Sequence, residues 1–220
     1  MRIALFFGLV LSFQAFAQTM PNCNYADLET SHQSYESWQD TFLDTLYKVS
    51  ENYAPTDLIP LSDLGAADYK VRAFITEDLR ALFLSAERAG AALEIQSAYR
   101  SYTYQVQTFQ YWVDKEGEAA ALKTSARAGH SEHQLGTALD FRSKGGPAPW
   151  DLEDWAESEA GAWLAENAWH YGFVMSYPKG KEALTCYSYE PWHYRYMGRD
   201  LARAIKESGL TLREWLWARQ

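Results

Sequence analysis

The chain of 220 residues has few basic side chains, and this shortage limits what it can bind. Lys and Arg together number 20 against 29 Asp and Glu, so the formal net charge is −9 at pH 7. Binding to nucleic acid depends on basic side chains that neutralise phosphates. The acidic balance therefore argues against nucleic acid as a partner.

Long apolar runs are also lacking. After the first residues, no segment approaches the roughly 20 apolar residues that a membrane-spanning helix needs. The opening MRIALFFGLVLSFQAFA combines Arg2, an apolar run at residues 3–13 and a small-x-small ending at residues 15–17, which is typical of an export signal. A retained membrane anchor is the alternative, although the run is short for one. We expect residues 1–17 to be a signal peptide cleaved before Gln18, and the mature protein to be periplasmic or secreted without stable membrane insertion.

Two common hydrolase signatures are missing. No G-x-S-x-G occurs in the sequence, so a serine hydrolase of that type has no support. No H-E-x-x-H occurs either, so a zinc site would have to take its ligands from outside the helical zincin pattern.

Cysteine is scarce, with Cys23 and Cys186 as the two examples. An even pair in an exported protein predicts one disulfide, which would tie the start of the mature chain to its C-terminal third. Two free buried thiols are the alternative.

Hydrophobic residues make up 47% of the chain and aromatic residues 15%, which fits one globular domain over residues 18–220. Apolar spacing predicts an N-terminal helical extension at about 18–60, with its helix at 24–51, and further helices at 66–90, 102–117, 151–170 and from residue 199 onward. Alternation predicts strands at 93–98, 137–141, 172–177, 184–187 and 193–197. We therefore expect an α+β fold in which helices flank a small, mostly antiparallel sheet.

The stretch GHSEHQLGTALDF at residues 129–141 concentrates side chains that can ligate a metal. His133 and Asp140 are seven positions apart, and a strand that starts after Gly136 could bring them together. His193 offers a third ligand, and Glu190 stands three positions before it. A catalytic zinc takes three such ligands and leaves one position open. Two ordinary buried histidines and a salt-bridged aspartate remain the alternative on spacing alone.

Longer patterns resemble a known family. Ser131-x-His133-x-x-Gly136-x-Ala138-x-Asp140, followed by Glu190-x-Trp192-His193, is similar to the two signatures of the LAS metallopeptidases, the group of lysostaphin, D-Ala-D-Ala peptidases and sonic hedgehog. Ser97-Ala98-Tyr99-Arg100-Ser101 with Gln105 resembles an element of the VanY-type D-alanyl-D-alanine carboxypeptidases. The resemblance covers roughly residues 53–217 and implies a hedgehog/D,D-peptidase-like fold. Cys186 departs from it, because glycine is common at that position.

The resemblance implies a role for each matching residue. His133, Asp140 and His193 would bind one Zn²⁺, Glu190 would be the general base, and Arg100 would stabilise the oxyanion. The implied substrate-binding residues are Ser131, Gln105, Tyr99 and Trp192. Ser131 could equally cap the turn that carries His133, and the two aromatic residues could equally belong to the core. We expect Glu132 to be solvated, and His130 and His170 to be structural or peripheral.

The implied activity is that of a zinc-dependent D,D-carboxypeptidase which removes the terminal D-alanine from peptidoglycan stem peptides. One alternative is an L,D-carboxypeptidase that acts on tetrapeptide stems. A second is a non-catalytic, zinc-stabilised module that binds the cell wall, as the inclusion of sonic hedgehog in the group suggests. The presence of Glu190 and Arg100 argues against this second alternative.

Overall fold

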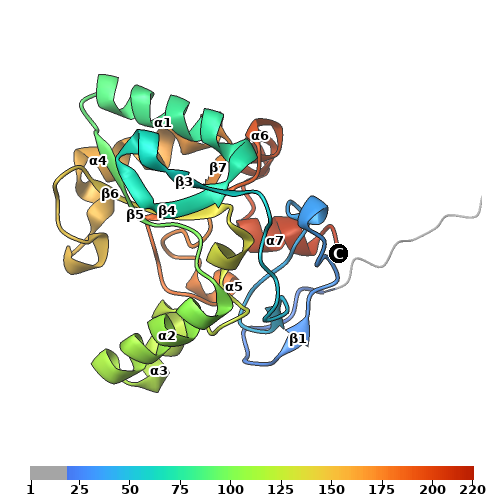
Figure 1. Cartoon of the computed structure of the whole chain (residues 1–220). Coiled ribbons are helices and arrows are strands. Elements are labelled where there is room, and N and C mark those ends of the chain that lie inside the picture. Colours follow the sequence, from blue (N-terminus) through green and yellow to red (C-terminus); the bar gives the residue numbers. More distant parts are fainter. Residues whose placement is uncertain (1–18) are drawn as a thin grey trace, which may run out of the picture.

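The computed structural model describes residues 19–220, so the expected signal peptide at residues 1–17 lies outside the described residues. A four-stranded antiparallel sheet with the order β5-β6-β8-β7 forms the centre (Figure 1). Its strands are β5 (Leu93–Ser97), β6 (Ala138–Ser143), β7 (Phe173–Met175) and β8 (His193–Tyr196). The predicted α+β class is confirmed.

Two small sheets accompany the central one. The antiparallel pair is β3 (Leu58–Leu61) with β4 (Ala66–Arg72), and the parallel pair is β1 (Leu28–Glu29) with β2 (Tyr47–Lys48). Short 3-10 turns connect many of the elements, at Tyr35–Ser37, Ser62–Leu64, Ala73–Ile75, Glu132–Leu135, Pro149–Asp151, Trp155–Glu157 and Ala168–Tyr171.

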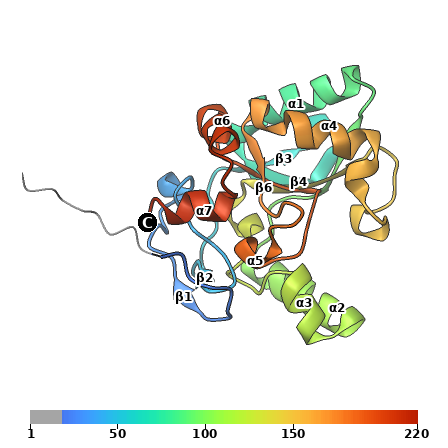
Figure 2. The ribbon, with the colours of Figure 1, turned by 180° about the vertical axis from the view of Figure 1, so that it is seen from behind.

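Helices α1 (Thr76–Arg88) and α4 (Glu159–Asn167) cover one face of the central sheet (Figures 1 and 2). The C-terminal helices are α6 (Arg199–Ser208) and α7 (Leu212–Trp217), and α5 (Glu182–Thr185) is a single turn. Helices α2 (Tyr102–Glu116) and α3 (Glu118–Thr124) form a separate lobe on the other side of the molecule. Within the described residues, no helix combines the length and apolar character needed to cross a membrane.

Alternation along β6 and β8 gives the central sheet two different faces. Leu139 and Phe141 of β6 pack with Tyr194 and Tyr196 of β8 in the main hydrophobic core, toward α1 and α4. Successive strand residues point to opposite faces. Asp140, between the two core residues of β6, and His193, next to Tyr194 on β8, therefore point away from this core. The sheet thus carries a polar, buried face that can hold a site.

The predicted helix at 24–51 is wrong, because this segment is built from β1, β2 and short turns. The Asp44 carboxylate accepts hydrogen bonds from the backbone N–H groups of Leu46 and Tyr47, and this local bond turns the chain. Side-chain oxygens of this kind compete with the helical hydrogen-bond pattern. The helix-like spacing of Trp38 and Phe42 reflects packing against different clusters.

Three other predicted elements also need correction. Residues 66–72 are the strand β4 rather than the start of a helix, because they pair with β3 and bury Val71. Helix α4 starts only at Glu159, after Ser158 caps it through the backbone N–H of Gly161. Residues 182–185 form α5 and not a strand.

A disulfide joins Cys23 to Cys186, whose Cα atoms are 5.2 Å apart. Cys186 follows α5 with φ of 70° and is the one non-glycine residue of the described part with a positive φ. This left-handed conformation favours glycine, the residue that is common here in the resembled family. The disulfide at this position fixes the N-terminal segment to the chain that leads into Glu190.

Removing this disulfide should lower the free energy of unfolding by about 2–5 kcal/mol, because it closes a very long loop, whose cysteines have a sequence separation of 163. The measurement is denaturant unfolding of Cys23→Ser/Cys186→Ser. The matched variant Cys23→Ser/Cys186→Gly should recover about 1 kcal/mol, since glycine tolerates the left-handed backbone. An unchanged unfolding midpoint in the double serine variant would contradict the prediction.

Candidate active site

His133, Asp140 and His193 meet at the polar face of the central sheet. One ligand atom from each lies within 4.8 Å of the others, and all three residues are buried. Nε2 of His133 is 3.3 Å from Oδ2 of Asp140, and Nδ1 of His193 is 3.0 Å from Oδ1 of the same carboxylate. The structure therefore brings together the three residues that the sequence suggested as metal ligands.

Local structure explains how each of the three is positioned. Ser131 caps the 3-10 turn Glu132–Leu135 by accepting a hydrogen bond from the backbone N–H of His133. Gly136 ends this turn with φ of 71°, where an added Cβ would lie 2.8 Å from Cδ2 of Leu58. The next strand, β6, then places Asp140 directly opposite His193, the first residue of β8, in the register of the sheet.

The donor set fits a divalent metal ion. Nδ1 of His133 donates to the carbonyl of Ala98 at 2.7 Å, so Nε2 carries the free lone pair. That Nε2 is buried and makes no hydrogen bond within the described residues. Burial and the nearby charge of Arg100 lower the pKa of His133 to about 4, which keeps the ring neutral. A neutral imidazole facing a carboxylate across a short gap is what a cation between them requires.

Glu132 is the residue that sequence reasoning placed wrongly. It is 4% exposed rather than solvated. Its Oε2 lies 3.0 Å from Nε2 of His193 and accepts a hydrogen bond from Ser176 at 2.6 Å. Its Oε1 accepts from Arg195 at 3.1 Å. Glu132 and His133 are neighbours on the same 3-10 turn, and both of their side chains are buried.

Arg195 completes this buried group. Its Nη2 donates to the carbonyls of Trp38 and Thr41, at 2.6 and 2.9 Å. Burial alone would raise the pKa of Glu132, but the hydrogen bond with His193 and the charge of Arg195 outweigh it and lower that pKa to about 2. A sequence signal did exist: Arg195 lies two positions after His193, on the same face of β8, and a buried arginine needs an acidic partner.

Glu190 lies beside the three converging residues, with Oε2 3.7 Å from Nδ1 of His193. Burial and the charge of Asp140 raise the pKa of Glu190 to about 8, although the charge of His193 opposes them. Arg100 enters from the loop after β5, and its Nη2 is 3.9 Å from Oδ2 of Asp140. A carboxyl group with a pKa near neutrality and a fixed guanidinium are the groups that acid–base and oxyanion chemistry use.

The expected substrate-binding residues divide into two pairs. Ser131 and Trp192 line the cavity next to the converging residues. Gln105 and Tyr99 are not among the cavity-lining residues of the described chain, so their contact with substrate stays a prediction. Gln105 is fully buried and donates from Nε2 to the carbonyl of Ala126, because its position on α2 faces the inside of the lobe.

His130 and His170 play no part in the site, since neither lines the cavity. His130 is buried and bonds through Nδ1 to the carbonyl of Asp44 and through Nε2 to Asp27. His170 is exposed and stacks on the ring of Trp169. Both agree with the expectation that they are structural or peripheral.

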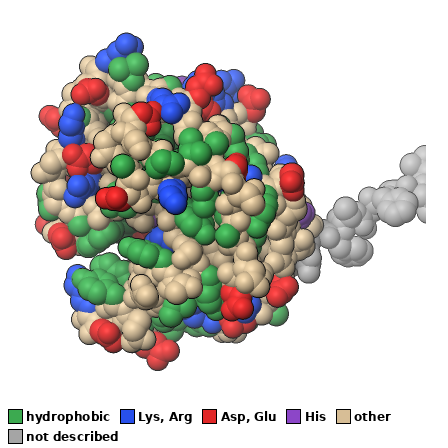
Figure 3. All heavy atoms as spheres, in the orientation of Figure 1, with side chains coloured by type: hydrophobic (Ala, Val, Ile, Leu, Met, Phe, Trp, Pro, Cys, Tyr) green, Lys and Arg blue, Asp and Glu red, His purple; other side chains and the backbone are tan. Residues whose placement is uncertain are grey.

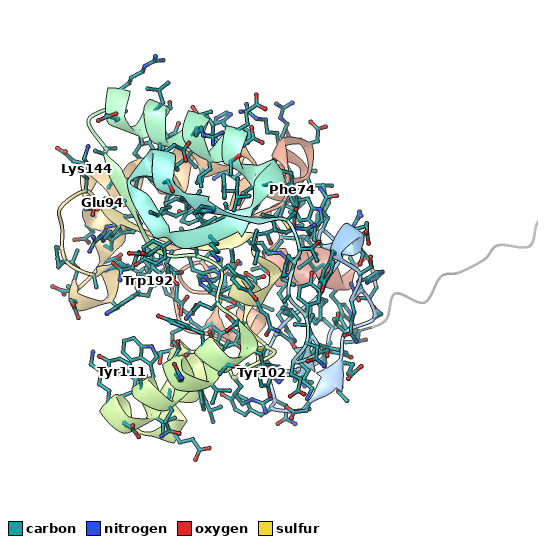
Figure 4. All side chains as sticks on the ribbon, viewed as in Figure 1. Phe74, Glu94, Tyr102, Tyr111, Lys144 and Trp192 are labelled. Atoms are coloured by element: carbon teal, nitrogen blue, oxygen red, sulfur yellow. A yellow bond between two sulfur atoms is a disulfide. The ribbon has the colours of Figure 1, made fainter. Side chains whose placement is uncertain are left out.

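The cavity has a volume of about 790 Å³ and is lined both by residues of α2 and α3 and by residues of the body of the molecule. Figure 3 shows it as a notch with hydrophobic side chains on both edges. In Figure 4, Trp192 lies on the body side of this gap and Tyr111 on the lobe side. The candidate ligands therefore lie at one end of a large, partly aromatic cleft.

Comparisons with known proteins agree with this geometry. The VanY family model, described as D-alanyl-D-alanine carboxypeptidase, matches residues 68–199. YodJ of Bacillus subtilis (strain 168) is 37% identical over 174 residues, which cover 77% of this chain and 63% of YodJ. The chain thus spans less than two thirds of the length of that relative.

Two solved structures share the fold. The vancomycin-resistance D,D-pentapeptidase VanY, solved in complex with Zn(II), is 30% identical with a TM-score of 0.70, over 81% of this chain and 99% of that one. The LD-carboxypeptidase LdcB is 33% identical with a TM-score of 0.68, over 80% and 86%.

Proposed function

The chain belongs to the VanY family of D-alanyl-D-alanine carboxypeptidases, and from this membership we propose that it is a zinc-dependent D,D-carboxypeptidase that removes the terminal D-alanine from peptidoglycan stem peptides. The observation that carries the proposal is the convergence of His133, Asp140 and His193 within 4.8 Å, with Glu190 beside them. The disulfide between Cys23 and Cys186 supports a periplasmic or secreted location, since such bonds persist in oxidising compartments.

Three atoms would hold the zinc: Nε2 of His133, a carboxylate oxygen of Asp140 and Nδ1 of His193. These are the nitrogen and oxygen ligands of a catalytic zinc site, which leaves a further position open. When bound, the ion polarises the scissile carbonyl and lowers the pKa of water. The other end of the His193 ring is fixed by Glu132, 3.0 Å from Nε2, so that Nδ1 stays directed at the site.

Glu190 supplies the proton transfers. Its carboxylate would take a proton from the attacking water and then donate it to the amine of the departing D-alanine. Arg100 lines the same end of the cavity. Its guanidinium would stabilise the negative charge that develops on the carbonyl oxygen, a contribution of about 3 kcal/mol for one such donor.

A second candidate function is an L,D-carboxypeptidase on tetrapeptide stems, because the chain also resembles LdcB. The D,D reading has the stronger support, since the family model and the VanY structure both point to it. A non-catalytic zinc-stabilised binding module is the weakest of the three, because it would have no use for Glu190 and Arg100.

Digestion of defined muropeptides tests these alternatives. We expect the purified protein to shorten pentapeptide stems by one D-alanine, observed by mass spectrometry, and to leave tetrapeptide stems intact. Cleavage of the tetrapeptide alone would replace the proposal with the L,D activity. Cleavage of neither would favour the binding module.

Removal of the metal is the matching biochemical test. Dialysis against a chelator should abolish pentapeptide cleavage, and one equivalent of Zn²⁺ should restore it. Without the ion, no Lewis acid would polarise the scissile carbonyl or lower the pKa of the water that Glu190 deprotonates. Full activity of a protein shown by elemental analysis to be free of zinc and other divalent metals would overturn the metal assignment.

A further inference from the structure

The cleft extends well beyond the residues assigned to catalysis. Pockets of about 300–1,000 Å³ enclose drug-sized ligands, so a cleft of about 790 Å³ offers more room than a terminal dipeptide fills. Its far part is formed by α2 and by the 3-10 turn Pro149–Asp151, which contribute Tyr104, Tyr111, Trp112 and Trp150. We call these four residues the aromatic arm.

The aromatic arm is continuous with the catalytic end. The rings of Trp112 and Trp150 are in edge-to-face contact with centroids 5.9 Å apart, and those of Trp150 and Trp192 are in edge-to-face contact at 6.0 Å. Trp192 directly precedes the candidate ligand His193. Three indole rings in successive contact therefore connect α2 of the helical lobe to the candidate ligands on the body.

Three side chains of the aromatic arm are substantially exposed to solvent. Tyr104 is 58% exposed, Tyr111 57% and Trp150 36%. Large aromatic side chains gathered along a cleft and left open to water typically mark a ligand-binding surface. Their exposure thus indicates a ligand that covers them.

The polar groups of the arm restrict what this ligand can be. Gln107 and Thr108 of α2 line the same cavity, and its charged lining residues include Glu116 and Glu153 as well as Lys115. The ammonium of Lys115 lies over the ring of Trp112, 4.7 Å from its centroid. The positive charge of Lys115 is thus opposed by the two carboxylates of Glu116 and Glu153, so these lining residues carry no excess of positive charge that would favour an acidic peptide. Amide and hydroxyl groups in the same lining as the aromatic rings suit a neutral, hydroxyl-rich ligand.

We propose that the aromatic arm binds the sugar portion of the substrate, a neutral N-acetylated disaccharide of the glycan strand to which the stem peptide is attached. Sugar rings present C–H groups that pack on the electron-rich faces of aromatic rings, and their hydroxyl and acetamido groups reach the polar side chains between them. This inference rests on the proposed function, because the stem peptide must occupy the catalytic end of the same cleft.

The test compares two substrates that differ only in the sugar. The oxidised mature protein is given a free pentapeptide stem, or the same stem linked to the disaccharide, and kcat/KM is measured for each. We expect the sugar-bearing substrate to be preferred by about three- to tenfold. Tyr111→Ala and Trp150→Ala should each reduce this preference toward one. Trp169→Ala, which removes an aromatic residue outside the cleft, should leave the preference unchanged.

Equal kcat/KM for the two substrates in the wild-type protein would overturn the proposal, and so would an unchanged preference in both arm variants. Because Tyr111 is largely exposed, its variant keeps the test valid if Trp150→Ala fails to fold. Binding of the disaccharide without a peptide, measured by calorimetry, gives a readout that needs no catalysis. If neither stem is cleaved but the disaccharide binds and Trp150→Ala abolishes that binding, the proposed activity fails while the sugar site stands.

Discussion

Replacing Glu190 by glutamine should lower kcat/KM for a pentapeptide stem by about 10²- to 10⁴-fold, the range for loss of a general base. Glutamine keeps the size and the polarity of the side chain, but it can neither accept the proton of water nor return one to the leaving amine. Glu190 lies beside the candidate ligands without being one of them, since the converging set found among residues 19–220 is His133, Asp140 and His193. Zinc content should therefore stay at the wild-type level.

The matched control is Glu207→Gln, an exposed glutamate on α6, which removes the same charge far from the cleft and should leave both kcat/KM and zinc content unaltered. Steady-state kinetics and elemental analysis on the same preparations give the two readouts. A Glu190→Gln enzyme that retains more than a tenth of the wild-type kcat/KM would exclude this residue as the base.

The second large effect concerns Glu132, which holds the far side of the His193 ring. Glu132→Gln should weaken zinc binding by about 10- to 100-fold, as expected for a carboxylate that orients a metal-ligating histidine. The amide brings an N–H group into a pocket that already contains the donors of Ser176 and Arg195. The rotation of the His193 ring would then no longer be fixed. Competition with a chromophoric chelator measures the affinity.

Glu132→Gln should also destabilise the fold by about 3–5 kcal/mol, because Arg195 would keep a buried charge without its partner. The double variant Glu132→Gln/Arg195→Met separates the two effects, since it removes both charges of the pair. It should recover much of the stability while zinc binding stays weak. Recovery of both properties together would show that Glu132 acts on the metal site only through folding.

Sequence reasoning succeeded where a local pattern decides the outcome. The strand at 137–141 and the helix at 102–117 have clear alternation or clear caps, and they correspond to β6 and α2. The candidate ligands were found because three separated motifs agree in order. The pairing of β6 with β8 then places Asp140 directly opposite His193. The two motifs that carry these residues are thereby brought together.

It failed where distant parts of the chain decide the outcome. The spacing of Trp38 and Phe42 suggests a helix, but the two side chains pack against different clusters, and nothing local reveals this. Glu132 was taken as solvated because its neighbour points inward, whereas its burial depends on Arg195, more than sixty positions away.

The direct pairing of Asp140 with His193 across β6 and β8 has a consequence for the behaviour of the protein in solution. An ion bound by both residues would cross-link the two inner strands of the sheet, and its bond to His133 would attach the turn Glu132–Leu135 to them. Stripping the ion should therefore accelerate deuterium uptake at the amides of β6 and β8 more than at those of α1 or α4. Zinc binding would therefore reduce local opening of the central sheet, in addition to supplying the metal for hydrolysis.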